Sequence, residues 1–136
     1  RSRHSNDNAL AESKNASVIR KHLGYAHIPC HHAQAVNAFT VEQLTPYLNF
    51  HRPCFFARTR TNDKGKIEKF YRYADMMTPY DKLKSLRDAH TYLKTGVSFS
   101  ALDALALRIT DNEAAALVNK TRTTLFDKIH PARKHA

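Results

Sequence analysis

The sequence predicts a mainly α-helical protein with one β-hairpin. Its 136 residues include only 3 Gly and 5 Pro, which is few for an all-β chain that turns about every ten residues. Apolar residues recur at three- and four-residue spacing through most of the chain, which is the helical period. A hydrophobic content of 42% with 25% charged residues is ordinary globular composition and is sufficient for one core.

The first two helical regions are placed by end signals and apolar spacing. A helix is expected from Ala9 to Leu23, where Gly24 ends it, and a loop follows through residue 32. The next helical region spans residues 33–50 in two pieces. Pro46 lies inside the second piece and either kinks it or marks its first turn.

Residues 55–61 and 66–73 differ from the rest because they alternate in character and are rich in aromatic residues and threonine. They flank the sequence NDKG, which has the composition of a tight turn, so they predict a β-hairpin. In the simplest register, Arg58, Arg60 and Arg72 would share one face of it.

Helices return after the hairpin. Thr78-Pro79 opens a short helix, with the threonine as cap and the proline in the first turn. A serine caps a helix over residues 99–109, and Thr110 or Asp111 caps a last helix that runs through Phe126.

Charge is the strongest compositional signal. The chain has 22 Lys+Arg against 12 Asp+Glu, a net charge of +10 and a pI near 9.9. A polyanion, above all nucleic acid, is therefore the expected partner. No apolar run approaches the roughly 20 residues of a membrane helix, so no membrane partner is expected. Cys30 and Cys54 are too few for a disulfide framework and favour a reducing, cytoplasmic setting.

Three segments resemble the C-terminal part of the DDE-type transposases and integrases of bacterial insertion sequences. They are SNDNALAESKN followed by VIRKHLGY at the start, PYLNFHRPC at residues 46–54 and TPYDKL at residues 78–83. In that family the third catalytic acid lies on a helix of an RNase H-like core, in a motif N-x-x-x-E-x-x-N. Asn8, Glu12 and Asn15 match this motif, so the resemblance implies that Glu12 is a catalytic and metal-binding residue.

The resemblance implies DNA transposition, in which DNA strands are cut and joined by phosphoryl transfer. Two Mg²⁺ or Mn²⁺ ions in the intact enzyme would activate the attacking oxygen and stabilise the leaving one. The family's two catalytic aspartates precede the glutamate, whereas only eleven residues precede Glu12 here, and Asp7 is too close to serve. We therefore expect a fragment of a longer bacterial cytoplasmic enzyme that is inactive by itself, since one carboxylate rarely suffices to hold a metal ion.

The same resemblance implies three parts. Residues 1–32 would be the terminal helix and loop of the RNase H-like core. Residues 33–126 would form a helical C-terminal region with the hairpin at about 55–73, and residues 127–136 would be a basic tail. Such enzymes work as multimers on two DNA ends, so a homo-oligomer is expected. The alanine-rich last helix either contacts another subunit or packs within its own chain.

Basic residues of the first helix and the hairpin are the candidate DNA contacts, because cationic and amide side chains bind backbone phosphates. An ordinary solvated face explains the hairpin's alternation equally well. The candidate DNA-binding residues are Lys14, Asn15, Arg20, Lys21, Arg58, Arg60, Lys66 and Arg72.

Two local patterns allow other interpretations. His27-x-x-Cys30 and His51-x-x-Cys54 have a passable spacing for tetrahedral zinc, but loop histidines and small buried thiols are the preferred explanation. Four aromatic residues just before the hairpin and at its start are expected in the core and not as nucleotide-stacking platforms. They are Tyr47, Phe50, Phe55 and Phe56. Two other function classes also stay open, a non-catalytic DNA-binding module and a protein-interaction or oligomerisation domain.

Overall fold

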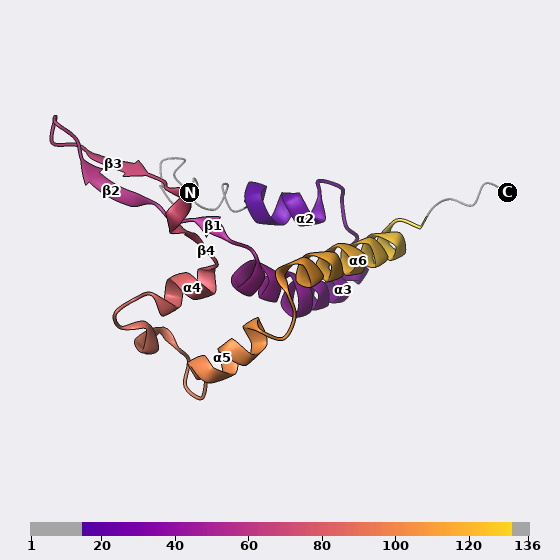
Figure 1. Ribbon diagram of the computed structural model, residues 1–136. Helices are drawn as coiled ribbons and strands as arrows, with labels where there is room; N and C mark the ends of the chain where they lie inside the picture. The colour runs from indigo at the N-terminus through magenta and orange to yellow at the C-terminus, as the bar shows by residue number, and fades with distance from the viewer. Residues whose placement is uncertain (1–14, 132–136) are drawn as a thin grey trace.

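Helices dominate the structure, and two small antiparallel sheets project from them (Figure 1). The computed structural model describes residues 15–131. The expected mainly α architecture is confirmed, and the structure adds a second two-stranded sheet to the expected hairpin. Within the described residues, no helix combines the length and the apolar character needed to cross a membrane.

The first helical segment is π-helical over Asn15–Arg20 (η1) and α-helical over Lys21–Leu23 (α2). It ends at Gly24, as expected, where the backbone takes a φ of 74°. Glycine adopts this conformation without the steric cost that a Cβ would bring. A loop and a 3₁₀ turn, Cys30–His32 (η2), lead to the next helix.

One helical run then extends from residue 33 to residue 51, as expected. It comprises the α-helix Ala33–Phe39 (α3) and two π-helical pieces, Thr40–Leu44 (η3) and Tyr47–His51 (η4). Pro46 directly precedes η4 with a helical φ of −58°. A proline is tolerated at the start of a helical piece because the N–H that it lacks has no partner there, so the run continues through it.

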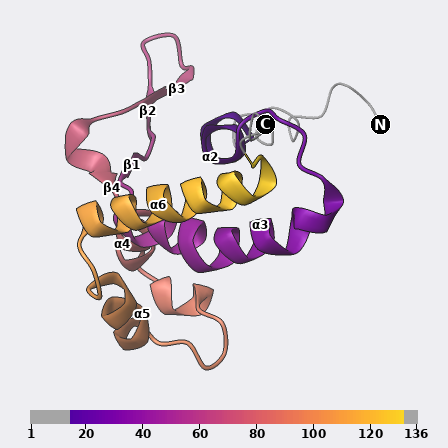
Figure 2. The ribbon, with the colours of Figure 1, turned by 90° about the vertical axis from the view of Figure 1, so that its right-hand side faces the viewer.

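The core lies between this run and the last helix, Asp111–Ile129 (α6), which runs alongside α3 (Figure 2). Leu44 is the most completely buried side chain, with 1% of its surface exposed. Leu23 and Ile28 pack against the same cluster and so attach α2 to it. The buried core residues are Phe39, Leu44, Val118, Leu125 and Ile129.

The last helix is longer than expected. It runs to Ile129, three residues beyond Phe126, and Ile129 is 6% exposed within the core. Residues 127–129 therefore belong to the packed helix and not to a basic tail. An isoleucine four residues after Leu125 continues the same apolar face of the helix.

The expected hairpin is present with shorter strands. Arg58–Thr61 (β2) pairs antiparallel with Ile67–Phe70 (β3), and Arg58 lies opposite Phe70. The second sheet joins Cys54–Phe55 (β1) to Met76–Met77 (β4). It closes the base of the hairpin, where a 3₁₀ turn, residues 73–75 (η5), precedes β4.

Three further helices follow the sheets, and two of them start at caps that the sequence predicted. They are Pro79–Lys84 (α4), Ala89–Tyr92 (η6) and Phe99–Ala106 (α5). Thr78 caps α4 and Ser98 caps α5.

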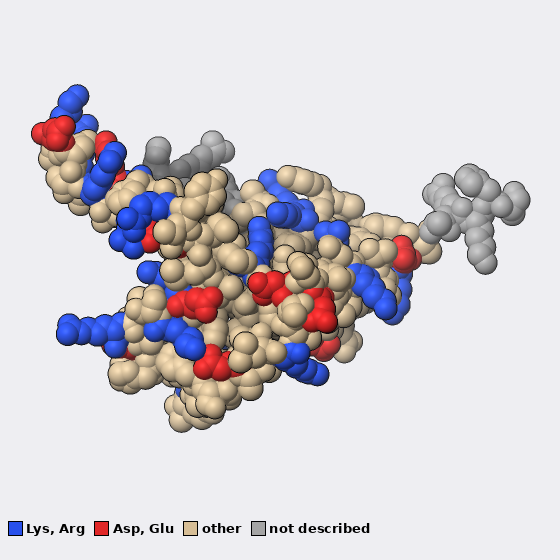
Figure 3. Space-filling view, in the orientation of Figure 1, with Lys and Arg blue, Asp and Glu red and all other residues tan. Residues whose placement is uncertain are grey.

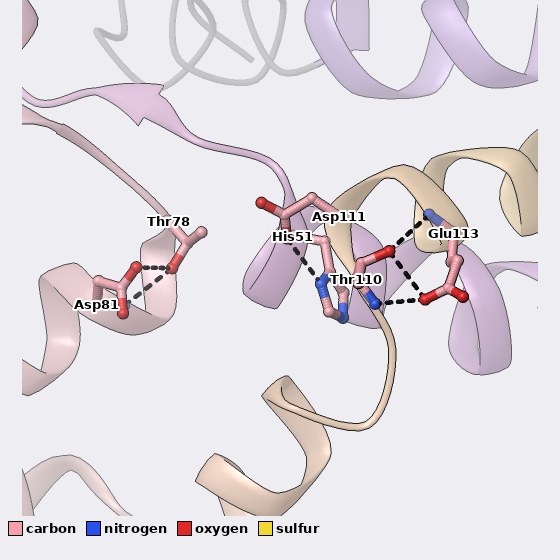
Figure 4. A network of polar contacts seen from close by, with 6 residues as sticks. All are labelled: His51, Thr78, Asp81, Thr110, Asp111 and Glu113. Atoms are coloured by element: carbon pink, nitrogen blue, oxygen red, sulfur yellow. Dashed lines mark hydrogen bonds and ion pairs between the residues drawn. The ribbon is translucent and has the colours of Figure 1, made fainter.

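Thr110 forms a reciprocal capping box with Glu113 at the start of α6 (Figure 4). Beside it, the buried His51 donates from Nδ1 to Oδ1 of Asp111 over 3.0 Å. This bond ties the end of η4 to the first turn of α6. Both contacts act at a helix N-terminus, where free backbone N–H groups and the helix dipole favour acidic side chains.

Candidate nucleic-acid interface

The predicted site residues of the first helix divide into two groups. Glu12 and Lys14 lie outside the described residues. Asn15, Arg20 and Lys21 lie on η1 and α2 and are exposed. The guanidinium of Arg20 lies over the ring of Tyr25, 5.2 Å from its centroid, and this cation–π contact leaves the charge available to a phosphate.

At the base of the hairpin, Arg58 and Arg72 share one carboxylate. Nη2 of Arg58 lies 2.6 Å from Oδ1 of Asp75, and Nε of Arg72 lies 2.9 Å from Oδ2. Hydrogen bonds from Arg72 and Arg58 hold the pKa of Asp75 at about 2. One negative charge therefore faces two positive charges, and the group keeps a net charge of +1.

Arg60, farther along β2, is also engaged within the hairpin. It lies opposite Glu68 on β3, with Nη2 3.4 Å from Oε2, and its guanidinium is 5.7 Å from the ring centroid of Phe70. Arg58 and Arg60 share a strand face, as predicted, while Arg72 lies beyond the paired residues and meets Arg58 through Asp75.

The hairpin lysines differ from its arginines. Lys64, Lys66 and Lys69 are exposed, and none forms an ion pair within residues 15–131. Their positions follow from the turn, where Oδ1 of Asn62 accepts hydrogen bonds from the backbone N–H groups of Lys64 and Lys66 at 3.0 and 2.9 Å. Gly65 supplies the positive φ of 71° that this turn requires.

A second cationic group surrounds His22 on α2. The side chain of His22 is 92% buried, given its 8% exposure, and neither ring nitrogen has a hydrogen-bond partner. Burial lowers the pKa of His22, and the charges of Arg52, Arg122 and Lys21 lower it further. Arg52 and Arg122 are half-buried and form no ion pair in the described part of the chain. An anion placed here would receive donors that are otherwise unused.

Acidic residues are scarce in the part of the sequence that precedes the hairpin turn, whereas Asp63, Glu68 and Asp75 lie in and beside the hairpin. Between residues 15 and 60, Glu42 is the single acidic residue of the sequence. In the view of Figure 3, lysine and arginine side chains lie over α2, and both basic and acidic side chains lie along the hairpin and around α4 and α6. The local excess of positive charge is therefore clearest around α2, where it would attract a polyanion.

Arg52, Arg122 and His22 are not among the DNA-binding residues that the sequence predicted. A signal for Arg52 is present, since PYLNFHRPC was already one of the three matched segments. Arg122 occupies a polar position of the last helix, where the sequence predicts a solvent-exposed side chain. Its closeness to α2 results from the packing of Leu23 against the core. No local pattern marks such a contact.

The histidine and cysteine pairs are not assembled into a metal site. Residues 15–131 contain no group of three or more His, Cys, Asp or Glu side chains placed to hold a metal ion. Cys30 and Cys54 are exposed free thiols, and His51 uses its Nδ1 for Asp111. The expectation of small buried thiols is therefore wrong for both cysteines.

The four aromatic residues expected in the core separate into two kinds. Tyr47 packs against the main core, Phe50 contacts Tyr80 with ring centroids 5.1 Å apart, and Phe56 is half-buried. Phe55 is 45% exposed, so its assignment to the core is wrong. Both residues of the short strand β1, Cys54 and Phe55, are exposed.

A cleft of about 400 Å³ lies between η4 and the start of α6. Apolar side chains, including Pro46, Phe50 and Leu117, line most of it, and Glu42 and Arg108 contribute charges of opposite sign. This cleft does not offer the cationic surface that a phosphate backbone requires.

Comparisons of the chain with known protein families, with curated proteins and with solved structures gave no match.

Proposed function

We propose that the chain is the DNA-binding C-terminal part of a DDE-type transposase or integrase, which cuts and joins DNA strands. In this proposal Glu12 supplies the third acidic residue for Mg²⁺ or Mn²⁺ in the intact enzyme. The motif of Asn8, Glu12 and Asn15 supports the catalytic part of the proposal. The distribution of unpaired cations supports the DNA-binding part, and this one observation carries it.

Cations that lack carboxylate partners mark where an external anion binds best. Within residues 15–131, Lys64, Lys66 and Lys69 form one such group on the hairpin, and Arg52 and Arg122 form another beside His22. Each lysine or arginine that neutralises a phosphate releases condensed counterions, which favours binding at low salt. The arginines at the hairpin base give a smaller contribution, because Asp75 and Glu68 already compensate part of their charge.

The positive charges near His22 would attract a phosphodiester group. Arg52 and Arg122 present guanidinium groups, and guanidinium is the side chain that binds phosphate through two parallel hydrogen bonds. A bound phosphate would also give the buried ring of His22 the hydrogen-bond partner that it lacks in the described chain.

Salt dependence of duplex binding tests the DNA-binding part. The logarithm of the association constant should fall linearly with the logarithm of salt concentration, measured by fluorescence anisotropy with a labelled duplex. Replacing Lys64, Lys66 and Lys69 with glutamine should reduce the magnitude of that slope by up to about 2.7, since each duplex phosphate contact contributes about 0.9.

A matched control removes three lysines from elsewhere, with Lys94, Lys120 and Lys128 replaced by glutamine. Both triple variants carry the same net charge, so a hairpin-specific effect appears as a smaller slope in the first variant only. Equal slopes in the two variants would overturn the assignment to the hairpin. No duplex binding at low salt, together with a defined oligomer in sedimentation, would favour the protein-interaction class instead.

The catalytic part needs a longer polypeptide that carries the upstream aspartates. In such a protein, Glu12→Gln should abolish metal-dependent strand cleavage while duplex binding persists. Cleavage at the unchanged rate by the Glu12→Gln protein would refute the role of Glu12 and leave a non-catalytic DNA-binding module.

A further inference from the structure

Three aromatic rings form an exposed cluster at the base of the hairpin. The ring of Phe55 on β1 meets the ring of Tyr73 edge-on with centroids 5.4 Å apart, and that of Tyr71 with centroids 6.4 Å apart. Phe55 is 45% exposed, Tyr71 60% and Tyr73 85%. The rings hold one another in place while about half or more of each side chain stays accessible to a ligand.

Such exposure is unfavourable unless a partner covers the rings. Each aromatic side chain carries a large apolar area whose transfer from water is favourable, and Met76 adds a fourth exposed apolar side chain beside them on β4. Edge-to-face packing also leaves ring faces free, and a ring face is what a planar ligand stacks against.

The charges beside the rings indicate the kind of partner. Arg58 and Arg72 lie on the same short segments as the rings, and their side chains are 54% and 50% exposed even though both contact Asp75. Two guanidinium groups share one carboxylate, so the surface next to the rings is positive. An apolar surface bordered by arginines whose charge is only partly compensated is complementary to a ligand with planar apolar groups and negative charges. Unpaired nucleotides have both.

We propose that Phe55, Tyr71 and Tyr73 form a stacking platform for unpaired DNA bases, and that Arg58 and Arg72 contact the adjoining phosphates. The inference rests on the proposed function for the identity of the polyanion as DNA. It adds that the chain binds single-stranded segments of its substrate through the bases. In contrast, the hairpin lysines Lys64, Lys66 and Lys69 would contact the phosphate backbone of both single-stranded and double-stranded DNA.

The sequence provides a direct probe, because it contains no tryptophan. Tyr73→Trp places a single indole in the cluster, and its fluorescence should be quenched by single-stranded oligodeoxythymidine. A duplex of the same length should quench it much less, since paired bases have no free faces. The control is Tyr92→Trp, at a tyrosine that is 61% exposed on η6, outside the cluster. Its fluorescence should not change with either DNA.

Binding constants give a second readout. Tyr71→Ala combined with Tyr73→Ala should weaken single-strand binding about fivefold or more, the loss expected for one stacked base. Duplex affinity should change less than twofold. Tyr71→Phe with Tyr73→Phe should retain the single-strand affinity, because stacking needs the ring and not the hydroxyl. Circular dichroism of each variant checks that it is folded.

Several outcomes would overturn the platform. They are an unquenched Tyr73→Trp protein, equal quenching of the Tyr92→Trp control, and equal losses of single-strand and duplex affinity in the double alanine variant. If the substitutions in the cluster change self-association of the protein and leave DNA binding unchanged, the cluster is a protein contact instead. Failure of the two proposals is distinguishable, since duplex binding that depends on the hairpin lysines would persist without quenching if the platform is wrong. Quenching by single strands without any duplex binding would refute the duplex interface and support the platform.

Discussion

The hydroxyl of Tyr80 lies 2.7 Å from Oδ1 of Asp103 and ties α4 to α5. The Tyr80 side chain is 6% exposed, and its ring packs between those of Phe50 and Phe99, with centroids 5.1 and 6.3 Å away. Burial, together with the hydrogen bond to Asp103 and the charge of that residue, raises the pKa of Tyr80 to about 12. This small cluster connects the helical run of residues 33–51 with the two helices that follow the sheets.

The raised pKa predicts a loss of stability at alkaline pH. Below pH 10 the phenol is protonated in both the folded and the unfolded state, so its stabilising effect is complete. Between about pH 10 and 12 the unfolded state releases the proton first, and the free energy of unfolding falls. Tyr80→Phe should lose about 1 kcal/mol at pH 8 with the hydrogen bond and should show a shallower decline above pH 10. Urea titrations of both proteins from pH 8 to 12 measure the difference, and parallel curves would contradict the assignment.

Asp75 should anchor the hairpin except in acid. Its pKa of about 2 lies below the ordinary value of 3.8, so the contribution is complete above about pH 4 and is lost as the pH falls towards 2. The protection of the backbone amides of residues 58–61 and 67–70 against hydrogen exchange, relative to an unfolded chain at the same pH, should fall over that range. Asp75→Asn should give fast exchange already at neutral pH.

The matched control for Asp75→Asn is Glu68→Gln. The Arg60–Glu68 pair is exposed and its atoms are 3.4 Å apart, and such surface pairs contribute little to stability. Glu68→Gln should therefore leave the exchange rates of the hairpin nearly unchanged. Similar acceleration in both variants would show that Asp75 has no special role.

Leu44 is the residue on which the main core depends most. It is 1% exposed between η3 and α6, and Leu44→Ala should cost about 2–5 kcal/mol, because a cavity remains where the side chain is removed. Val41→Ala, three residues earlier at a position 68% exposed, should change stability by less than about 0.5 kcal/mol. Chemical denaturation followed by circular dichroism measures both, and comparable losses would place the core elsewhere.

His22 should titrate below the ordinary histidine pKa of 6.5. Since the unfolded state gains its proton at a higher pH than the folded state, the free energy of unfolding should fall as the pH drops below 6.5. His22→Leu removes two buried nitrogens without partners in the described chain, so it should be neutral or stabilising and should flatten that pH dependence. His90→Gln, at an exposed position, is the control.

Proton NMR of the imidazole tests the same site for anion binding. Inorganic phosphate should raise the pKa of His22, because a neighbouring anion favours the protonated ring. An unchanged titration at saturating phosphate would contradict the phosphate contact of Arg52, Arg122 and His22.

By itself, the sequence determined the features that depend on neighbours along the chain. The cap Thr78, the stop at Gly24 and the turn of the hairpin were predicted and are present, and Ser98 and Thr110 are the caps among the alternatives that the sequence offered. Each depends on backbone geometry and hydrogen bonds within about four residues, which the residue types specify directly. The motif that contains Glu12 is equally local, and the role proposed for Glu12 rests on that motif.

The tertiary structure decided which of these residues are accessible and which charges are compensated. Phe55 is exposed because β1 pairs with β4, whose residues lie more than twenty positions later. Arg58 and Arg72 are partly neutralised because the chain returns Asp75 to the base of the hairpin, and His22 is buried because α2 packs against the core. Burial and ion pairing depend on contacts between distant segments, and the free energy of such a contact is set by the whole fold and not by the local residues.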